Sequence, residues 1–240
     1  ISAKAYHVLR EEGLVHPRPD VVRVVVSLLS EAADLWVEAD GDGYATTRLL
    51  KVLEAYPDDL IMRKLVVSTL GVIGDRSALA VMPELFDLND ARNDMDVRSL
   101  AVQALGRLGY RLPRGDREAV VDFFEEHVFQ DRNGLVQAYA VTAVGPIDHE
   151  RVNALLWRVL TGELTADYVY EEWLGGRPTG RLRQAKTDEL AAIVLVRRAH
   201  QGDELARLYV DRASQHTSPR VRDLIRKARS GVPELPPLPP

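Results

Sequence analysis

The chain has 240 residues, of which 46% are hydrophobic and 28% charged, with a formal net charge of −5 and no cysteine. The absence of cysteine excludes disulfides, thiolate metal sites and thiol nucleophiles. No run of about 18 apolar residues is present, so we expect a soluble, cytoplasmic protein without a membrane span. Residues 1–150 hold 16 Lys and Arg against 25 Asp and Glu, whereas residues 151–230 hold 15 against 10. The acidic first part disfavours binding of nucleic acid.

Apolar residues recur along the chain at the spacing of one helix face, i, i+3, i+4, i+7. In chain order, such stripes predict first helices that begin near Asp20, Met62, Val97, Val136 and Leu190. Each is followed by a second helix, over residues 44–56, 77–88, 116–129, 150–160 and 203–214. A final helix from Ser218 closes the series. The sequence therefore predicts about five helical pairs and a closing helix.

Three of the first helices align column by column. The apolar columns are Met62/Val97/Val136, Leu65/Leu100/Tyr139, Val66/Ala101/Ala140, Leu70/Leu105/Val144 and Ile73/Leu108/Ile147. Gly71, Gly106 and Gly145 also align, which gives spacings of 35 and 39 residues. A period of this length is typical of stacked helical pairs. We expect the glycines at these positions, with Gly74 and Gly109, to end each helix in a cap or a tight turn.

The pattern resembles the HEAT repeat family, in particular the bacterial variety known from phycobilisome lyase-type repeats. The resemblance rests on Asp96-Val97-Arg98 with Ala104-Leu105-Gly106, and on Met62-Arg63 with Leu70 to Asp75. In that family an Asp and an Arg near the start of the first helix link neighbouring repeats. The resemblance thus implies structural roles for Asp96, Arg98 and Arg63. Gln137 replaces the arginine in the third repeat, so we expect the links to be interrupted there.

These patterns predict an all-α fold, an α-solenoid in the form of a right-handed superhelix. The repeat domain is expected to cover residues 1–230, with an irregular insertion at about 161–186 and a proline-rich tail at 231–240. The second helices should line one side of the stack. Repeat arrays commonly bind partners through such a side.

The insertion carries the residues that we expect to contact a partner. It combines aromatic side chains with arginines, both of which are enriched at binding hot spots. The predicted partner-binding residues are Tyr168, Tyr170, Trp173, Arg177, Arg181 and Arg183. The alternative is that Tyr170 and Trp173 only pack the insertion onto the stack. In that case the arginines would be solvated or paired with neighbouring glutamates.

No motif for catalysis, a metal or a cofactor is present. The glycines lack the spacing and the preceding strand of a phosphate-binding loop. No two histidines have the i, i+4 spacing of a metal pair, and His149 beside Asp148 lacks a nucleophile. Asp40-Gly41-Asp42-Gly43 lacks the glutamate that would complete a calcium loop, so we expect a turn. We therefore expect no catalytic residues, no metal site and no cofactor.

The sequence favours a non-catalytic scaffold or adaptor that binds another protein through its concave face and the insertion. One alternative is a HEAT-like DNA-binding or DNA-repair enzyme of the alkylpurine glycosylase type, for which Trp157, Trp173 and Asp167 supply residue types but no motif. Another is that the chain is a regulatory domain of a longer protein. This alternative is suggested by the missing initiator methionine and the proline-rich end.

Overall fold

The computed structural model describes residues 3–31, 44–87, 89–164, 169–174, 177–184 and 186–231. The helical class predicted from the sequence is confirmed, because helices make up most of the described chain. The chain divides into two compact units, Ile1–Leu112 and Pro113–Pro240, which we describe separately. A single domain over residues 1–230 stays a prediction. Tyr168, Asp40 to Gly43 and the tail from residue 232 lie outside the described residues.

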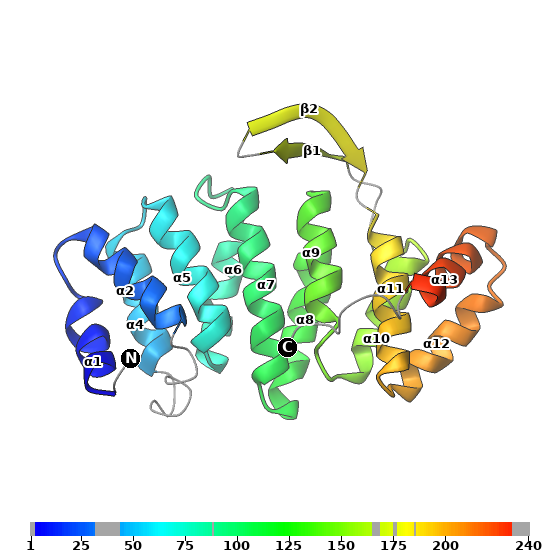
Figure 1. Ribbon diagram of the computed structural model, residues 1–240, viewed down its shortest axis with the longest axis horizontal. Coiled ribbons are helices and arrows are strands. Elements are labelled where there is room, and N and C mark those ends of the chain that lie inside the picture. The colour runs from blue at the N-terminus through cyan, green and yellow to red at the C-terminus, as the bar shows by residue number, and fades with distance from the viewer. Residues whose placement is uncertain are drawn as a thin grey trace. The chain divides into compact units, whose positions relative to one another are not determined.

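Unit 1 is built from two layers of helices (Figure 1). In one layer α2 packs against α5, and α5 packs against α7. In the other, α4 and the short helices η2 and α6 lie against α5 and α7. The elements are α1 (Ala3–Val8), η1 (Leu9–Gly13), α2 (Pro19–Glu31), α4 (Tyr44–Ala55), α5 (Leu60–Ile73), η2 (Arg76–Val81), α6 (Met82–Leu85) and α7 (Met95–Arg111).

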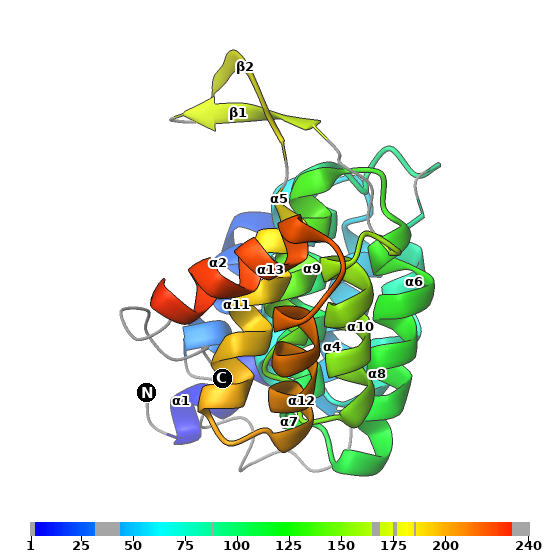
Figure 2. The same cartoon turned by 90° about the vertical axis from the view of Figure 1, so that its right-hand side faces the viewer.

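Unit 2 repeats this two-layer arrangement. Helix α11 packs against both α9 and α13, while α10 packs against α8 and α12 (Figure 2). The elements are α8 (Arg114–Glu126), η3 (Val128–Gln130), α9 (Gly134–Val144), α10 (Glu150–Leu160), β1 (Val169–Leu174), β2 (Arg177–Gln184), α11 (Thr187–His200), α12 (Glu204–Ser214) and α13 (Pro219–Gly231). In both units, the second helices of the predicted pairs form one layer and the first helices form the other.

The aligned columns form the buried core, with one correction. Four of the five predicted apolar columns are buried in all three repeats, although Ile147 of the last column lies in the turn after α9. In the Leu65/Leu100/Tyr139 column the leucines are only half-buried, and Tyr139 is 37% exposed. The next column, Val67/Val102/Val141, is fully buried instead. The prediction chose the wrong edge of the stripe because both columns are apolar in sequence, and only the neighbouring helices decide which one faces the core.

The predicted helix ends are confirmed at Gly74 and Gly145, the C-caps of α5 and α9, but are wrong at Gly71, Gly106 and Gly109. Gly71 lies inside α5, where an added Cβ would be 2.4 Å from Ala104 Cα of α7. Gly106 and Gly109 lie buried inside α7. The backbone of Gly74, which ends α5, is extended, with φ −60° and ψ 158°. The glycine at position 71 therefore serves close approach of two helices rather than a left-handed turn.

A capping side chain precedes each aligned helix at the same period. Asp59 accepts a hydrogen bond from the backbone N–H of Met62 at 3.0 Å, and Asp94 accepts one from Val97 at 2.8 Å. Asn133 caps α9 in the same way. These residues satisfy backbone donors that a helix start leaves free. The sequence analysis overlooked this column, although Asp and Asn are the residues that favour it.

Arginines join one first helix to the start of the next in unit 1. Arg23 of α2 forms an ion pair with Asp59, the cap of α5. Arg63 of α5 donates from Nη2 to Asn93 Oδ1 at 2.8 Å, immediately before the cap of α7. Consecutive helices are thus tied together at their beginnings.

Two further polar contacts involve the residues that the HEAT resemblance singled out. Lys64 Nζ lies 2.7 Å from Asp96 Oδ2, which connects α5 to α7. Arg98 donates from Nη1 to the backbone carbonyl of Asn93 at 2.6 Å, in the loop before its own helix. The Lys64–Asp96 contact thus links two consecutive helices, whereas the Arg98 contact stays within the segment that leads into its own helix.

Gln137 makes a related contact in unit 2, where its Nε2 donates to the backbone carbonyl of Asp131 at 2.8 Å. A different residue then ties α11 to the turn after α9: Arg198 donates to the carbonyl of Ile147 at 2.9 Å. Different residues therefore link the helices in the repeat where Gln137 replaces the arginine.

The helix predicted over residues 77–88 is broken. The segment forms η2 and the single-turn α6, with Pro83 in the first turn of α6. A continuous α-helix would bring the Pro83 ring against the carbonyl of residue 79 and remove one hydrogen bond. The helix predicted over 116–129 likewise ends at Glu126 and continues as η3. The other second helices match their predicted ranges within two residues.

Candidate functional site

The predicted insertion contains a β-hairpin, where an irregular segment was expected. Strands β1 and β2 pair as a two-stranded antiparallel sheet. Tyr170 and Trp173 lie in β1, while Arg177, Arg181 and Arg183 lie in β2 (Figure 1). The hairpin therefore brings five of the six predicted partner-binding residues into one small element.

The register of the hairpin sets which of these residues are opposite one another. Tyr170 pairs with Arg183, and Trp173 pairs with Pro178. The register shifts between Glu171 and Trp173, so Arg181 falls in the irregular stretch of β2. An isolated two-stranded hairpin is marginally stable in water, and the edges of such a sheet can pair with a strand of another chain.

A pocket that the sequence did not predict lies in unit 1 among the second helices. It has a volume of about 510 Å³. We call it the acidic pocket, and its lining residues come from α4, α5, η2, α6 and the following loop: Leu50, Leu53, Glu54, Arg63, Ala80, Val81, Glu84, Leu85, Asp87, Asp90 and Arg92. Four carboxylates and two guanidinium groups thus surround an apolar floor.

The floor of the acidic pocket follows from the helical spacing of its residues. Leu50 and Leu53 lie three residues apart on α4 and share a face. Leu53 and Leu85 belong to the buried core, while Leu50 is half-buried. The break at Pro83 ends η2 and starts α6 beside this floor. The apolar surface that the pocket exposes therefore comes from half-buried residues such as Leu50 and Val81, with Leu53 and Leu85 buried beneath them.

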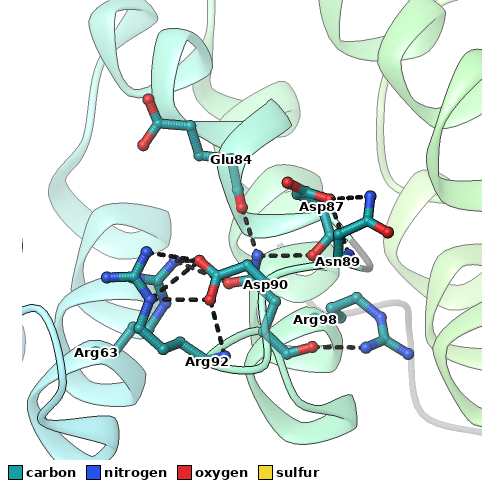
Figure 3. Close-up of polar contacts among 8 residues, drawn as sticks. Arg63, Glu84, Asp87, Asn89, Asp90, Arg92 and Arg98 are labelled. Atoms are coloured by element: carbon teal, nitrogen blue, oxygen red, sulfur yellow. Dashed lines mark hydrogen bonds and ion pairs between the residues drawn. The ribbon is translucent and has the colours of Figure 1, made fainter.

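A polar loop forms one wall of the acidic pocket (Figure 3). Arg92 donates to Asp90 through Nε at 2.9 Å and Nη2 at 2.8 Å. The Arg92 side chain and its backbone N–H lower the pKa of Asp90 to about 2. Asp87 accepts hydrogen bonds from the backbone and side chain of Asn89. Two of the four carboxylates, those of Asp87 and Asp90, therefore already have hydrogen-bond partners within the loop.

Arg63 lies at the base of this wall and is only 7% exposed. Its Nη2 reaches Asn93 at 2.8 Å and Asp90 Oδ2 at 3.9 Å, but its buried Nε has no hydrogen-bond partner among the described residues. Burial lowers the pKa of Arg63, and the nearby Arg92 charge adds to this, against the opposing charges of Asp90 and Glu84. The guanidinium is therefore a buried cation with an unused donor.

Glu54 and Glu84 are the carboxylates that the fold leaves available. Both side chains are exposed, and no hydrogen bond or ion pair joins either carboxylate to another described residue. Figure 3 shows the Glu84 carboxylate pointing away from the pair formed by Asp90 and Arg92. A cation placed at this rim would face two carboxylates that form no hydrogen bond or ion pair in the described part of the chain.

Trp157, named above for the DNA-repair alternative, is packed within unit 2. Its side chain is 8% exposed, and its ring centroid lies 5.7 Å from that of Tyr209 and 5.6 Å from that of His216. The Arg212 guanidinium lies over the ring at 4.6 Å. A ring covered in this way offers no free face to an extruded base. Of the other residues named for that alternative, Asp167 lies outside the described residues.

An ion-pair network lies on the second helices of unit 2. Arg151 of α10 forms ion pairs with Asp122 and Glu125 of α8, and Arg158 also binds Glu125. Burial raises the pKa of Glu125, but the hydrogen bonds from both arginines outweigh it and leave the pKa below its ordinary value. These charges are committed to joining α8 and α10.

His149 has a structural role. It precedes α10, and its Nδ1 accepts a hydrogen bond from the backbone N–H of Arg151 at 3.3 Å. Among the described residues, no group of three or more His, Asp or Glu has the arrangement of a metal site. Likewise, none of the described helices has the length and apolarity needed to cross a bilayer.

No model of a known protein family matches the chain, and no curated protein matches it.

Proposed function

We propose that this chain is a non-catalytic scaffold of HEAT type, a right-handed solenoid that binds another protein through its second helices and its hairpin. The repeated columns, the repeated caps and the two helical layers within each unit support the repeat architecture. In such arrays each repeat packs on its neighbours, and the exposed surface of one layer serves for contacts.

The acidic pocket carries the proposal. It lies among second helices, it has an apolar floor, and Glu54 and Glu84 at its rim take no part in holding the fold. Its volume of about 510 Å³ is within the range of sites that hold ligands. A partner can therefore bind the carboxylates of Glu54 and Glu84 without breaking a contact that holds the fold together.

The hairpin is the second contact element in this proposal. Trp173→Ala, or Arg181→Ala with Arg183→Ala, should weaken partner binding by about tenfold or more, as expected for aromatic and arginine hot spots. Helicity and the melting temperature should stay nearly unchanged. The measurement is a pull-down from the source cells with the intact chain and with each variant as bait, alongside circular dichroism.

Arg226→Ala is the matched control, because this arginine of α13 is exposed and pairs only locally with Asp223 among the described residues. A chain that lacks residues 161–186 tests the hairpin as a whole. If the variants lose stability as much as binding, the hairpin residues belong to the core. Duplex DNA binding that falls steeply with salt would favour the DNA-processing alternative instead.

A further inference from the structure

We infer that the acidic pocket binds a short basic segment of a partner protein. A Lys or Arg side chain would lie between Glu54 and Glu84, and a neighbouring apolar side chain would cover the floor at Leu50 and Val81. This inference deepens the proposed function and rests on it, because it names the kind of partner that the second helices take.

The charges of the acidic pocket select a cation. Its lining has four carboxylates against two guanidinium groups. Arg92 binds Asp90, and Arg63 lies 3.9 Å from the same carboxylate, so both guanidinium groups face a charge of the protein itself. Neither Glu54 nor Glu84 forms an ion pair with another described side chain, although the charge of Glu84 acts on Arg63 and Arg92 at longer range. Both carboxylates would repel a phosphate or an acidic peptide.

The floor of the pocket favours a peptide over a small hydrophilic cation. The half-buried Leu50 and Val81 form an apolar surface next to the charged rim. A hydrated ion gains nothing from contact with such a surface, whereas a Leu or Ile beside a basic residue loses its exposure to water there. The combination of rim and floor therefore matches a basic residue with an apolar neighbour.

Arg63 gives an independent indication of a ligand. Its side chain is more than nine-tenths buried in the pocket wall, and its Nε has no acceptor among the described residues. A buried donor without a partner is costly. The Nε atom is closed to solvent, so a backbone carbonyl of a bound peptide would reach this donor only where the pocket wall shifts to admit it.

The test begins with selection of random 12-residue peptides, displayed on phage, against the immobilised full chain. Selected peptides should be enriched in Lys or Arg next to Leu, Ile or Val. One selected peptide, labelled with fluorescein, is then titrated with the protein and followed by fluorescence anisotropy. Its affinity should fall as the salt concentration rises, because the contact is between opposite charges at a partly exposed rim.

The decisive variant is Glu54→Gln with Glu84→Gln, which should weaken binding of this peptide by about tenfold or more. The matched control is Glu12→Gln with Glu31→Gln, which removes the same charge from exposed positions of unit 1 outside the pocket. The control should change the affinity by less than about twofold. All four glutamates are exposed, so circular dichroism should show folded protein in each case.

Three outcomes would overturn the inference. The selected peptides could lack basic residues, or the pocket variant could bind as tightly as its control. Self-association of the chain that the pocket variant abolishes would instead identify a second copy as the occupant. The proposed scaffold function is judged separately: a partner captured by the intact chain and lost on deletion of residues 161–186 would uphold it even if the acidic pocket fails.

Discussion

Asp203 shows how one side chain can hold several elements of unit 2. It accepts a hydrogen bond from the backbone N–H of Ala206 at 2.9 Å, which caps α12. It also pairs with Arg198 at 2.7 Å and accepts a hydrogen bond from Asn153 at 3.0 Å. Arg198 is only 8% exposed. The carboxylate thus neutralises a buried cation and starts a helix at the same time.

Asp203→Ala should destabilise the protein by about 3 kcal/mol, because it removes the cap and leaves the buried Arg198 without its counter-charge. Asp203→Asn keeps an acceptor for the cap and should cost less. Urea denaturation monitored by circular dichroism measures both. An Asp203→Ala protein as stable as the parent would show that water compensates Arg198.

The same residue gives a dependence on pH. Burial raises the pKa of Asp203, but hydrogen bonds from Asn153 and Ala206 and the charge of Arg198 outweigh it and leave the pKa below its ordinary value. A carboxyl group with a lowered folded pKa stabilises the protein above its unfolded pKa of about 4, and this contribution disappears as the pH falls through the folded value. The Asp203→Asn protein has no carboxyl group at this position, so urea denaturation at a series of pH values should show that it lacks this part of the acid sensitivity.

At the scale of elements, the contact between α5 and α7 depends on a missing side chain. An added Cβ at Gly71 would lie 2.4 Å from the Ala104 Cα and 2.7 Å from its Cβ. Backbone atoms cannot move aside as a flexible side chain can. The two helices would therefore have to separate to admit even one methyl group.

Gly71→Ala should lower the free energy of unfolding by about 2 kcal/mol through this overpacking. Gly115→Ala is the matched control, because an added Cβ at Gly115 in α8 has no atom within 4 Å. The control should be neutral or stabilising by up to about 1 kcal/mol, since alanine favours the helix. Thermal denaturation of both variants distinguishes the two effects, and an equal response would contradict the packing role of Gly71.

The sequence predicts the helices well because their stripes are local. It misassigns Gly71 because a glycine serves equally for a helix cap and for close packing, and only the position of α7 decides between them. Two local signals were overlooked. Pro83 was sufficient to predict the break in the second helix. The pair Gly175-Gly176, which separates Val169 to Leu174 from the residues that follow, was sufficient to predict a hairpin.

The acidic pocket could not be predicted in the same way. Glu54, Arg63 and Glu84 come from three different helices. In sequence the two glutamates look like residues on a solvated face, and Arg63 was expected only to link repeats. Only the packing of α4, η2 and α6 brings them around one floor. The spatial arrangement of distant residues, rather than their type, defines this site.

At the scale of the whole molecule, the chain divides into two compact units. In repeat proteins each element depends mainly on its neighbours, so damage to one part need not spread. We expect Gly71→Ala to speed amide hydrogen exchange in α2, α4, α5 and α7 much more than in α11 to α13. Exchange followed by mass spectrometry measures this, and a uniform increase along the chain would indicate a single cooperative unit.

The polar contacts before the first helices have a consequence for how such a chain can change in length. Arg98 and Gln137 each bond a carbonyl oxygen in the loop that leads into their own helix. A duplicated segment with such a helix would carry both the side chain that makes this hydrogen bond and its own capping residue. Whole segments could thus be gained or lost in evolution while every surviving helix keeps a secured beginning.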